Sequence, residues 1–583
     1  MTIVSSTSTL DRLYIVLKKI LCLLIISTGI LSGCSSTQQP NETVAPTPAW
    51  ESTYQQGELN GESLYDLLIA ELAGHQQQYD VSLEKYLKQA ELTGDPGIIR
   101  RAARIAQFTK DASSLEKAAR IWVKYEPDSQ EPQTLLVGLL IQQGKFSKAL
   151  PFIEGALTTN SHQILALLNS HAAKMPPKEA QAYLSIINKQ TQRTPKNSEL
   201  WLSRGILERR VSDNNNALYS FNKALKLNPK NETVIIQKAD LLKDSGKYSQ
   251  ALDVIAAGLK RDPENKQLTI LKIQTLYKGN QPKTAVKESN QLISSFRTDN
   301  QLHLYLALLA LDFNRLDDSK AILQTLYSRT RDTSLHFYLG LIEEQLDNPE
   351  LAIQHYLQVN RGNNVLQAYT RTLALLAGDT KEPRVTDIIT KATANHAELA
   401  PDLINVYADW LRSFKFEKQA ITSLDKGIST YPDHIPLRYS RAMMRPPEEF
   451  PQSEADFRFI LNKDPNNAMA LNALGYTLSL YTERYQEAYQ LLSKAISLKP
   501  DDPAVMDSIG WILFKLNRYD EALTYLTKAY KVYPDPEVGS HLIAVLVAQN
   551  KNQQAQELFT ELSSKFPENP HIMNTEKTLN GQL

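Results

Sequence analysis

The side chains of this sequence that are able to do chemistry do not form a recognisable reaction centre. The sequence lacks the zinc motif His-Glu-x-x-His, the nucleophile motif Gly-x-Ser-x-Gly, a phosphate loop ending in Gly-Lys-Ser/Thr, and an acidic calcium loop. His336 and His355 are expected on facing helices of one pair, where a metal would have two ligands. No carboxylate or cysteine stands at ligand spacing from them, so packing or surface roles are the better interpretation. The sequence therefore predicts no catalytic residues, no metal site and a protein that is not an enzyme.

Cys34 is the candidate for covalent modification. It ends the string Leu31-Ser32-Gly33-Cys34, which follows an apolar run over residues 20–31 and a basic start made by Arg12, Lys18 and Lys19. The string resembles the lipobox of bacterial lipoproteins. This resemblance implies that residues 1–33 are a signal peptide and that Cys34 carries the lipid, including palmitate, at the mature amino terminus. Ser35 favours sorting to the outer membrane by the same resemblance, whereas a plain secretory peptide or an uncleaved anchor is the alternative.

Composition excludes several classes of protein. Cys22 lies in the expected signal peptide and Cys34 carries the lipid, so the mature chain has no thiol for a disulfide or a metal. Lys plus Arg and Asp plus Glu both number 64, so no net field attracts nucleic acid. Residues 34–61 are rich in Ser, Thr, Gln and Pro and are predicted to be a disordered tether. The covalent lipid is the only cofactor that the sequence predicts.

Small residues recur at an interval that predicts the fold. Ala217, Ala251 and Ala285 follow one another at a constant interval of 34, and Ala488 and Ala522 repeat it. This interval is typical of the tetratricopeptide repeat, a helix-turn-helix unit of about 34 residues. Within one unit, a Gly or Ala about twelve residues before each of these alanines lets the two helices approach closely. A Pro at the end of the unit ends the second helix. The predicted fold class is all-α, a right-handed superhelical solenoid of antiparallel helix pairs.

The quality of the repeats divides the chain into predicted segments. Divergent helical repeats are expected over residues 62–196, well-formed tetratricopeptide repeats over 197–442, and a carboxyl-terminal set of repeats over 443–574. The last of these begins at a proline-rich stretch, and residues 575–583 read as a polar tail.

The inner wall of such a solenoid, lined by the first helix of each pair, is the default binding surface. Helical phase places five groove residues on two consecutive first helices: Asn472, Tyr476, Asp507, Trp511 and Phe514. The aromatic members form a candidate hot spot for an extended peptide or a partner helix. Filling of the seam between repeats is the alternative. Further forward the inner wall carries charges of both signs, among them Arg209, Asp240, Lys243 and Asp244, which favours a protein partner over a polyanion.

The start of the array carries a more specific likeness. Residues 67–74 read Leu-Leu-Ile-Ala-Glu-Leu-Ala-Gly, and Tyr79-Asp80, Asp95-Pro96-Gly97 and Arg104-Ile105-Ala106 follow. These strings resemble the opening of the LbcA-type family, the long tetratricopeptide outer-membrane lipoproteins of gammaproteobacteria. The signal peptide, tether, length and repeat content agree with that family across nearly the whole chain.

The resemblance implies an adaptor on the periplasmic face of the outer membrane. Members of the family bind a periplasmic carboxyl-terminal processing serine protease and present substrates to it, chiefly peptidoglycan hydrolases. A second hypothesis is a scaffold for assembly of an outer-membrane export or envelope complex. A protease and hydrolases that purify with the chain favour the adaptor, and a membrane channel that does so favours the assembly scaffold.

Overall fold

The structure, a computed structural model, describes residues 60–159 and 161–579. The predicted signal peptide, the lipid site Cys34 and the tether up to residue 59 lie outside the described residues. The described chain is built of helices, with no strand among these residues, and divides into two compact units, the first ending at Ile322 and the second beginning at Leu323. Among these same residues, no helix is both long enough and apolar enough to cross a bilayer.

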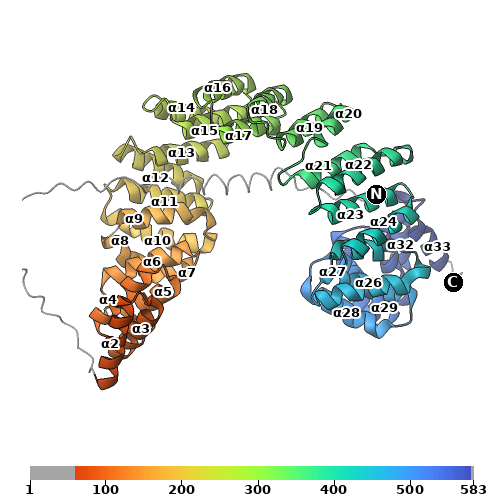
Figure 1. Cartoon of the computed structure of the whole chain (residues 1–583), viewed down its shortest axis with the longest axis horizontal. Helices are drawn as coiled ribbons and strands as arrows, with labels where there is room; N and C mark the ends of the chain where they lie inside the picture. Colours follow the sequence, from red (N-terminus) through yellow and green to blue (C-terminus); the bar gives the residue numbers. More distant parts are fainter. Residues whose placement is uncertain (1–59, 160, 580–583) are drawn as a thin grey trace, which may run out of the picture. The chain divides into compact units, whose positions relative to one another are not determined.

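The first unit runs from red to green in Figure 1. Its helices follow one another in antiparallel pairs, and each pair packs against the next. Their bounds are α2 Gly61–His75, α3 Tyr79–Thr93, α4 Pro96–Phe108, α5 Ala112–Tyr125, α6 Gln130–Gln142, α7 Phe146–Ala149, the 3-10 helix η1 Leu150–Phe152, α8 Ile153–Thr159, α9 Ser161–His171, η2 Ala172–Lys174, α10 Pro177–Arg193, α11 Ser198–Arg210, α12 Asn214–Leu227, α13 Glu232–Asp244, α14 Tyr248–Leu259, α15 Lys266–Lys278, α16 Pro282–Ser295, α17 Asn300–Asp312 and α18 Leu316–Thr330.

The second unit begins inside α18 and continues in the same manner. Its further helices are α19 Leu335–Gln345, α20 Pro349–Tyr356, α21 Val365–Leu375, η3 Asp379–Lys381, α22 Glu382–Asn395, α23 Ala400–Ser413, α24 Glu417–Thr430, α25 Ile435–Met444, η4 Pro447–Glu449, α26 Phe450–Lys463, α27 Ala468–Tyr481, α28 Tyr485–Leu498, α29 Pro503–Lys515, α30 Tyr519–Val532, α31 Pro536–Ala548, α32 Asn552–Lys565 and α33 Pro570–Leu579. The predicted all-α solenoid of antiparallel helix pairs is confirmed.

The repeat interval also governs how the first helices begin. Asn197, Asn231, Asn265 and Asp299 are separated by this same interval, and each caps the helix that follows it. Their side-chain oxygens accept backbone N–H groups of the first helical turn, as Asn265 Oδ1 does from Leu268 at 2.9 Å. Such a cap contributes about 1 kcal/mol to a helix. The array therefore restarts at a capping Asn or Asp in each of these four repeats.

Close approach within a pair depends on glycine, as predicted. The recurring residue Ala217 is fully buried. A methyl group added to Gly205 would lie 2.6 Å from the ring of Phe221 on the second helix of the pair. Gly340 and Tyr356 repeat this arrangement at 2.5 Å in the second unit. No larger residue fits these positions unless the aromatic ring moves.

The pair of α25 and α26 keeps the small residue and adds an ion cluster to it. Ala442 on α25 stands one repeat interval after Ala408 and is buried. Arg441 directly precedes Ala442. Its Nε and Nη2 donate to the two oxygens of Asp456 on α26 at 2.8 and 2.7 Å, and Arg438 Nη1 donates to Asp456 at 3.0 Å. Asp456 is only 2% exposed. Charge-assisted hydrogen bonds therefore join α25 to α26 next to the close contact at Ala442.

The predicted segment boundaries compare unevenly with the helices. The boundary at 196/197 falls between α10 and α11, whereas the one at 442/443 falls inside α25. Residues 575–579, predicted to belong to a polar tail, continue α33, because Ile572 and Thr575 are buried where α33 packs on α31 and α32. The last four residues lie beyond the described chain.

Candidate functional site

The predicted groove residues lie on α27 and α29, the first helices of two consecutive pairs. α27 packs on α29, and α29 packs on α31, the first helix of the next pair. The three helices form one continuous face of the second unit, hereafter the α27–α31 face. Side chains of α31 that the sequence analysis did not select complete this face.

Trp511 is the centre of an aromatic stack. Its ring lies 4.1 Å from the ring of His541 on α31 at an interplanar angle of 23°, and 5.1 Å from that of Phe514 at 21°. Lys515 Nζ lies 4.7 Å from the Trp511 centroid, a cation–π distance. Trp511 and Phe514 are half-buried and stack on each other, as the predicted aromatic patch requires.

The carboxylate of Asp507 is occupied by an internal partner. Asp507 Oδ1 and His541 Nδ1 are 2.9 Å apart, and both residues are buried. Asp507 therefore orients the imidazole that stacks on Trp511. Its carboxylate points to His541 and not towards a bound protein. His541 stands one repeat interval after Asp507, so the interval was the signal by which the sequence could have identified it.

Tyr476 joins α27 to α31. Its hydroxyl donates a hydrogen bond to Glu537, and its ring meets His541 edge-on at a centroid distance of 6.1 Å. Burial raises the pKa of the Tyr476 phenol well above its ordinary value, and the Glu537 carboxylate raises it further. The phenol therefore stays protonated and acts as a fixed hydrogen-bond donor.

Asn472 and Trp511 each hold a buried polar atom without an internal partner. Asn472 Oδ1 and Trp511 Nε1 are shielded from solvent and make no hydrogen bond within the described chain. Buried donors and acceptors of this kind cost about 1 to 3 kcal/mol each. Both atoms lie beneath the surface of the α27–α31 face, and binding of a partner to this face stays a prediction.

The predicted charged wall of the first unit is neutralised internally. Arg209 Nη2 on α11 contacts Asp240 at 2.8 Å and Asp244 at 2.6 Å on α13, and Lys243 Nζ contacts Asp240 at 2.5 Å. Burial opposes ionisation of Asp240, but Lys243 and Arg209 outweigh it and lower its pKa. These charges hold adjacent first helices together and leave no single sign for a charged ligand.

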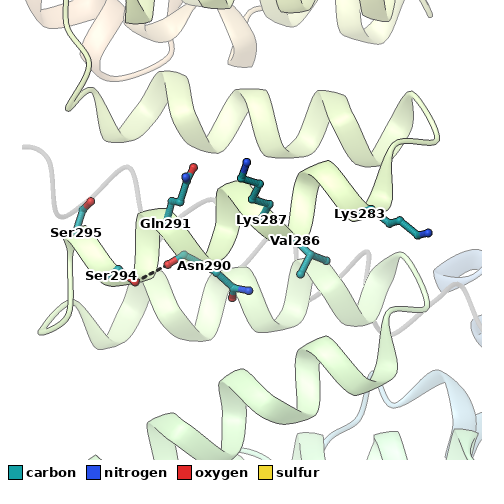
Figure 2. A pocket seen from close by; sticks show the side chains of 7 residues that line it. All are labelled: Lys283, Val286, Lys287, Asn290, Gln291, Ser294 and Ser295. Atoms are coloured by element: carbon teal, nitrogen blue, oxygen red, sulfur yellow. Dashed lines mark hydrogen bonds between the residues drawn. The ribbon is translucent and has the colours of Figure 1, made fainter.

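The histidine pair and the hollow on α16 do not have the converging groups that a second site needs. His336 and His355 approach to 2.8 Å between their Nδ1 atoms, and the described residues hold no group of three metal-ligating side chains. One hollow lies on α16 (Figure 2). All seven of its lining residues come from that single helix, so no groups converge on it from a second element.

Comparison with known proteins identifies the repeats. Models of the tetratricopeptide repeat match residues 211–272, 304–363 and 480–545. TPR repeat-containing protein PA4667 of Pseudomonas aeruginosa is 30% identical over 540 residues, which cover 91% of each chain. The peroxisomal targeting signal receptor of Candida albicans is 23% identical over 215 residues, 34% of each chain. Among solved structures, Naa15/Naa10 bound to HypK-THB aligns over 89% of this chain and 96% of that one, with 11% identity and a TM-score of 0.37.

Proposed function

Because this chain belongs to the tetratricopeptide repeat-containing proteins, whose helical arrays are scaffolds suited to protein–protein interaction, we propose that it is a non-enzymatic adaptor anchored to the outer membrane. In this proposal Cys34 carries the lipid, and the array lies on the periplasmic side. The array binds a carboxyl-terminal processing serine protease and presents protein substrates such as peptidoglycan hydrolases.

The observation that carries the proposal is the α27–α31 face. It presents half-exposed aromatic rings, which are typical anchors of protein interfaces, and the buried Asp507–His541 pair holds the central stack in place. Apolar side chains of a protein segment are able to pack against such rings. The signal peptide, the lipobox and the opening strings at residues 67–106 support the address and the choice of partner.

An adaptor of this kind needs no catalytic group. Binding the protease and its substrate on one array turns their encounter into a nearly intramolecular event, and the effective concentration reaches the millimolar range, on the order of 1 mM, for short flexible links. The rate of degradation therefore rises although the chemistry stays in the protease.

A pull-down tests the proposal. Residues 35–583, the predicted mature chain without the lipid-bearing Cys34, are incubated with periplasmic extract, and bound proteins are identified by mass spectrometry. We expect a carboxyl-terminal processing protease, with cell-wall hydrolases accumulating on the array when the protease serine is replaced by alanine. Export-channel components without a protease would refute the adaptor and support the assembly scaffold.

A matched pair of variants tests the site. Trp511→Ala removes the centre of the stack, and we expect it to weaken capture by about tenfold or more, the loss typical of an interface anchor. Tyr219→Ala removes a 49% exposed tyrosine from α12 in the other unit and serves as the control. Equal capture by both variants would exclude the α27–α31 face as the binding surface.

A further inference from the structure

The outer side of the first unit carries positive charge without paired carboxylates. The second helices of four consecutive pairs, α10, α12, α14 and α16, lie on this side, away from the inner wall that the first helices line. Six exposed lysines on or directly after these helices form no ion pair with any residue that the structure describes. We call them the lysine ridge: Lys178, Lys189, Lys226, Lys260, Lys283 and Lys287.

The buried residues of each helix turn the lysine ridge outward. Each of the six lysines stands two residues from a buried residue, and two residues correspond to a rotation of about 200° around an α-helix. On α16, Lys283 and Lys287 flank the buried Ala285 in this way (Figure 2). Lys226 follows the buried Ala224 of α12 by the same step. The six charges therefore lie on the side of their helices opposite the core.

The repeat extends the ridge over several pairs. Lys226 and Lys260 are one repeat interval apart, so they occupy the same position on successive second helices. Successive pairs lie about 10 Å apart, and the ridge from α10 to α16 therefore extends over roughly 30 Å. Of the three carboxylates on these four helices, Glu288 contacts Lys272 Nζ at 2.6 Å, and only Asp253 stands two residues from a buried residue. The outward side thus keeps a strong excess of positive charge.

This excess is confined to the first unit. Residues 177–298 contain 21 Lys and Arg but 11 Asp and Glu, whereas residues 323–583 contain 26 and 32. Arginines beside the second helices of the second unit are paired with carboxylates, as Arg384 Nη1 is with Glu350 at 2.8 Å and Arg484 Nη1 is with Glu454 at 2.9 Å. The neutral composition of the whole chain therefore conceals a basic surface on one unit and an acidic excess in the other.

We propose that the lysine ridge docks the first unit on a bilayer that contains anionic phospholipids, by attraction of the lysines to the lipid phosphates. A single sign of charge over roughly 30 Å matches an extended anionic plane. A small anion would instead need groups that converge on it, and the ridge has none. The acidic excess of the second unit does not favour contact of that unit with the same plane.

The choice of a bilayer over other polyanions rests on the lipid site at Cys34, which belongs to the proposed function. Twenty-five residues separate Cys34 from residue 60, the first that the structure describes. A flexible chain of this length has a root-mean-square end-to-end distance of about 25 to 30 Å. The lipid therefore keeps the first unit close to the bilayer, where the lysines are able to reach it.

Vesicle flotation tests the ridge without the lipid anchor. Residues 35–583 are mixed with vesicles of phosphatidylethanolamine and phosphatidylglycerol, or with neutral vesicles of phosphatidylethanolamine and phosphatidylcholine. Each lysine near an anionic surface strengthens binding by about fivefold, and salt screens this attraction. We expect binding to the anionic vesicles at about 50 mM salt, binding at least about tenfold weaker at about 500 mM, and no binding to the neutral vesicles.

Matched variants locate the contact. Lys226→Glu, Lys260→Glu and Lys283→Glu are combined in one chain, and we expect this variant to bind the anionic vesicles at least about tenfold more weakly. The control combines Lys426→Glu, Lys528→Glu and Lys531→Glu, which make the same change of net charge in the second unit. These three exposed lysines also stand two residues from a buried residue. We expect the control to bind within about twofold of the wild type.

Three results would overturn the proposal: no binding to anionic vesicles at low salt, equal binding to neutral vesicles, or an equal loss in both variants. The pull-down separates this proposal from the adaptor. Protease capture without vesicle binding refutes the lysine ridge alone, whereas vesicle binding without protease capture supports the ridge and refutes the adaptor.

Discussion

Replacing Gly205 by alanine measures how closely the helices of a pair must approach. An added methyl group would lie 2.6, 2.7 and 3.1 Å from three ring atoms of Phe221, which is fully buried. Gly138 on α6 provides a matched site in the same unit, because a methyl group there meets nothing within 4 Å. Both residues lie inside α-helices.

The comparison isolates the clash. Alanine improves helix propensity by about 1 kcal/mol at either site, so Gly138→Ala should stabilise its repeat by about that amount. Overpacking against Phe221 costs about 1 to 3 kcal/mol. The two variants should therefore differ by about 1 to 3 kcal/mol in local unfolding free energy, with Gly205→Ala the less stable.

Hydrogen exchange followed by mass spectrometry provides the local measurement, since each repeat of an array unfolds with its neighbours and a single global transition is not assured. For each variant we compare the amide protection factors with those of the wild type. This ratio should be about 5- to 150-fold smaller for α11 and α12 of Gly205→Ala than for α6 of Gly138→Ala. Adding Phe221→Leu should recover part of the loss through a favourable coupling energy. A difference below about 0.5 kcal/mol would refute the close-approach argument.

Three further predictions concern charges and hydrogen bonds. Asp456→Ala should destabilise α25 and α26 by about 3 to 5 kcal/mol in urea unfolding because it removes the buried carboxylate that Arg438 and Arg441 share, whereas Asp425→Asn, at a 46% exposed side chain, should cost under about 1 kcal/mol. The cations of Lys88 and Lys85 hold the pKa of Asp66 well below its usual range in the folded protein. In the unfolded chain the pKa of Asp66 is about 4, so ionised Asp66 stabilises the fold fully above about pH 4, and this stabilisation is lost as the pH falls below that value. Thermal unfolding of Asp66→Asn should consequently depend less on pH in this window than that of the wild type, and an unchanged dependence would contradict the assignment. Tyr476→Phe should lower protection of α27 and α31 by about 1 to 2 kcal/mol, since it leaves the Glu537 carboxylate without its donor.

The sequence by itself determined the helix pairs, because the contacts that define a pair are local. Ala217 and Gly205 are twelve residues apart on adjacent helices, and their small size together with the repeat interval is sufficient to indicate the close approach. The aromatic contact of Trp511 with Phe514 was predictable for the same reason, since residues three apart share one face of a helix.

Only the tertiary structure decided which carboxylates have internal hydrogen-bond partners and which apolar side chains remain exposed. Helical periodicity places leucines inside by default, yet α2 turns Leu68 outward because Lys85 and Lys88 of the next helix stabilise the buried Asp66. In the same way the carboxylate of Asp507 is hydrogen-bonded to the imidazole of His541 from the following pair. Periodicity predicts which side chains share one face of a helix. A polar side chain on the buried face costs little free energy only if a side chain of the neighbouring helix pairs with it, and that pairing is known only once the helices are packed.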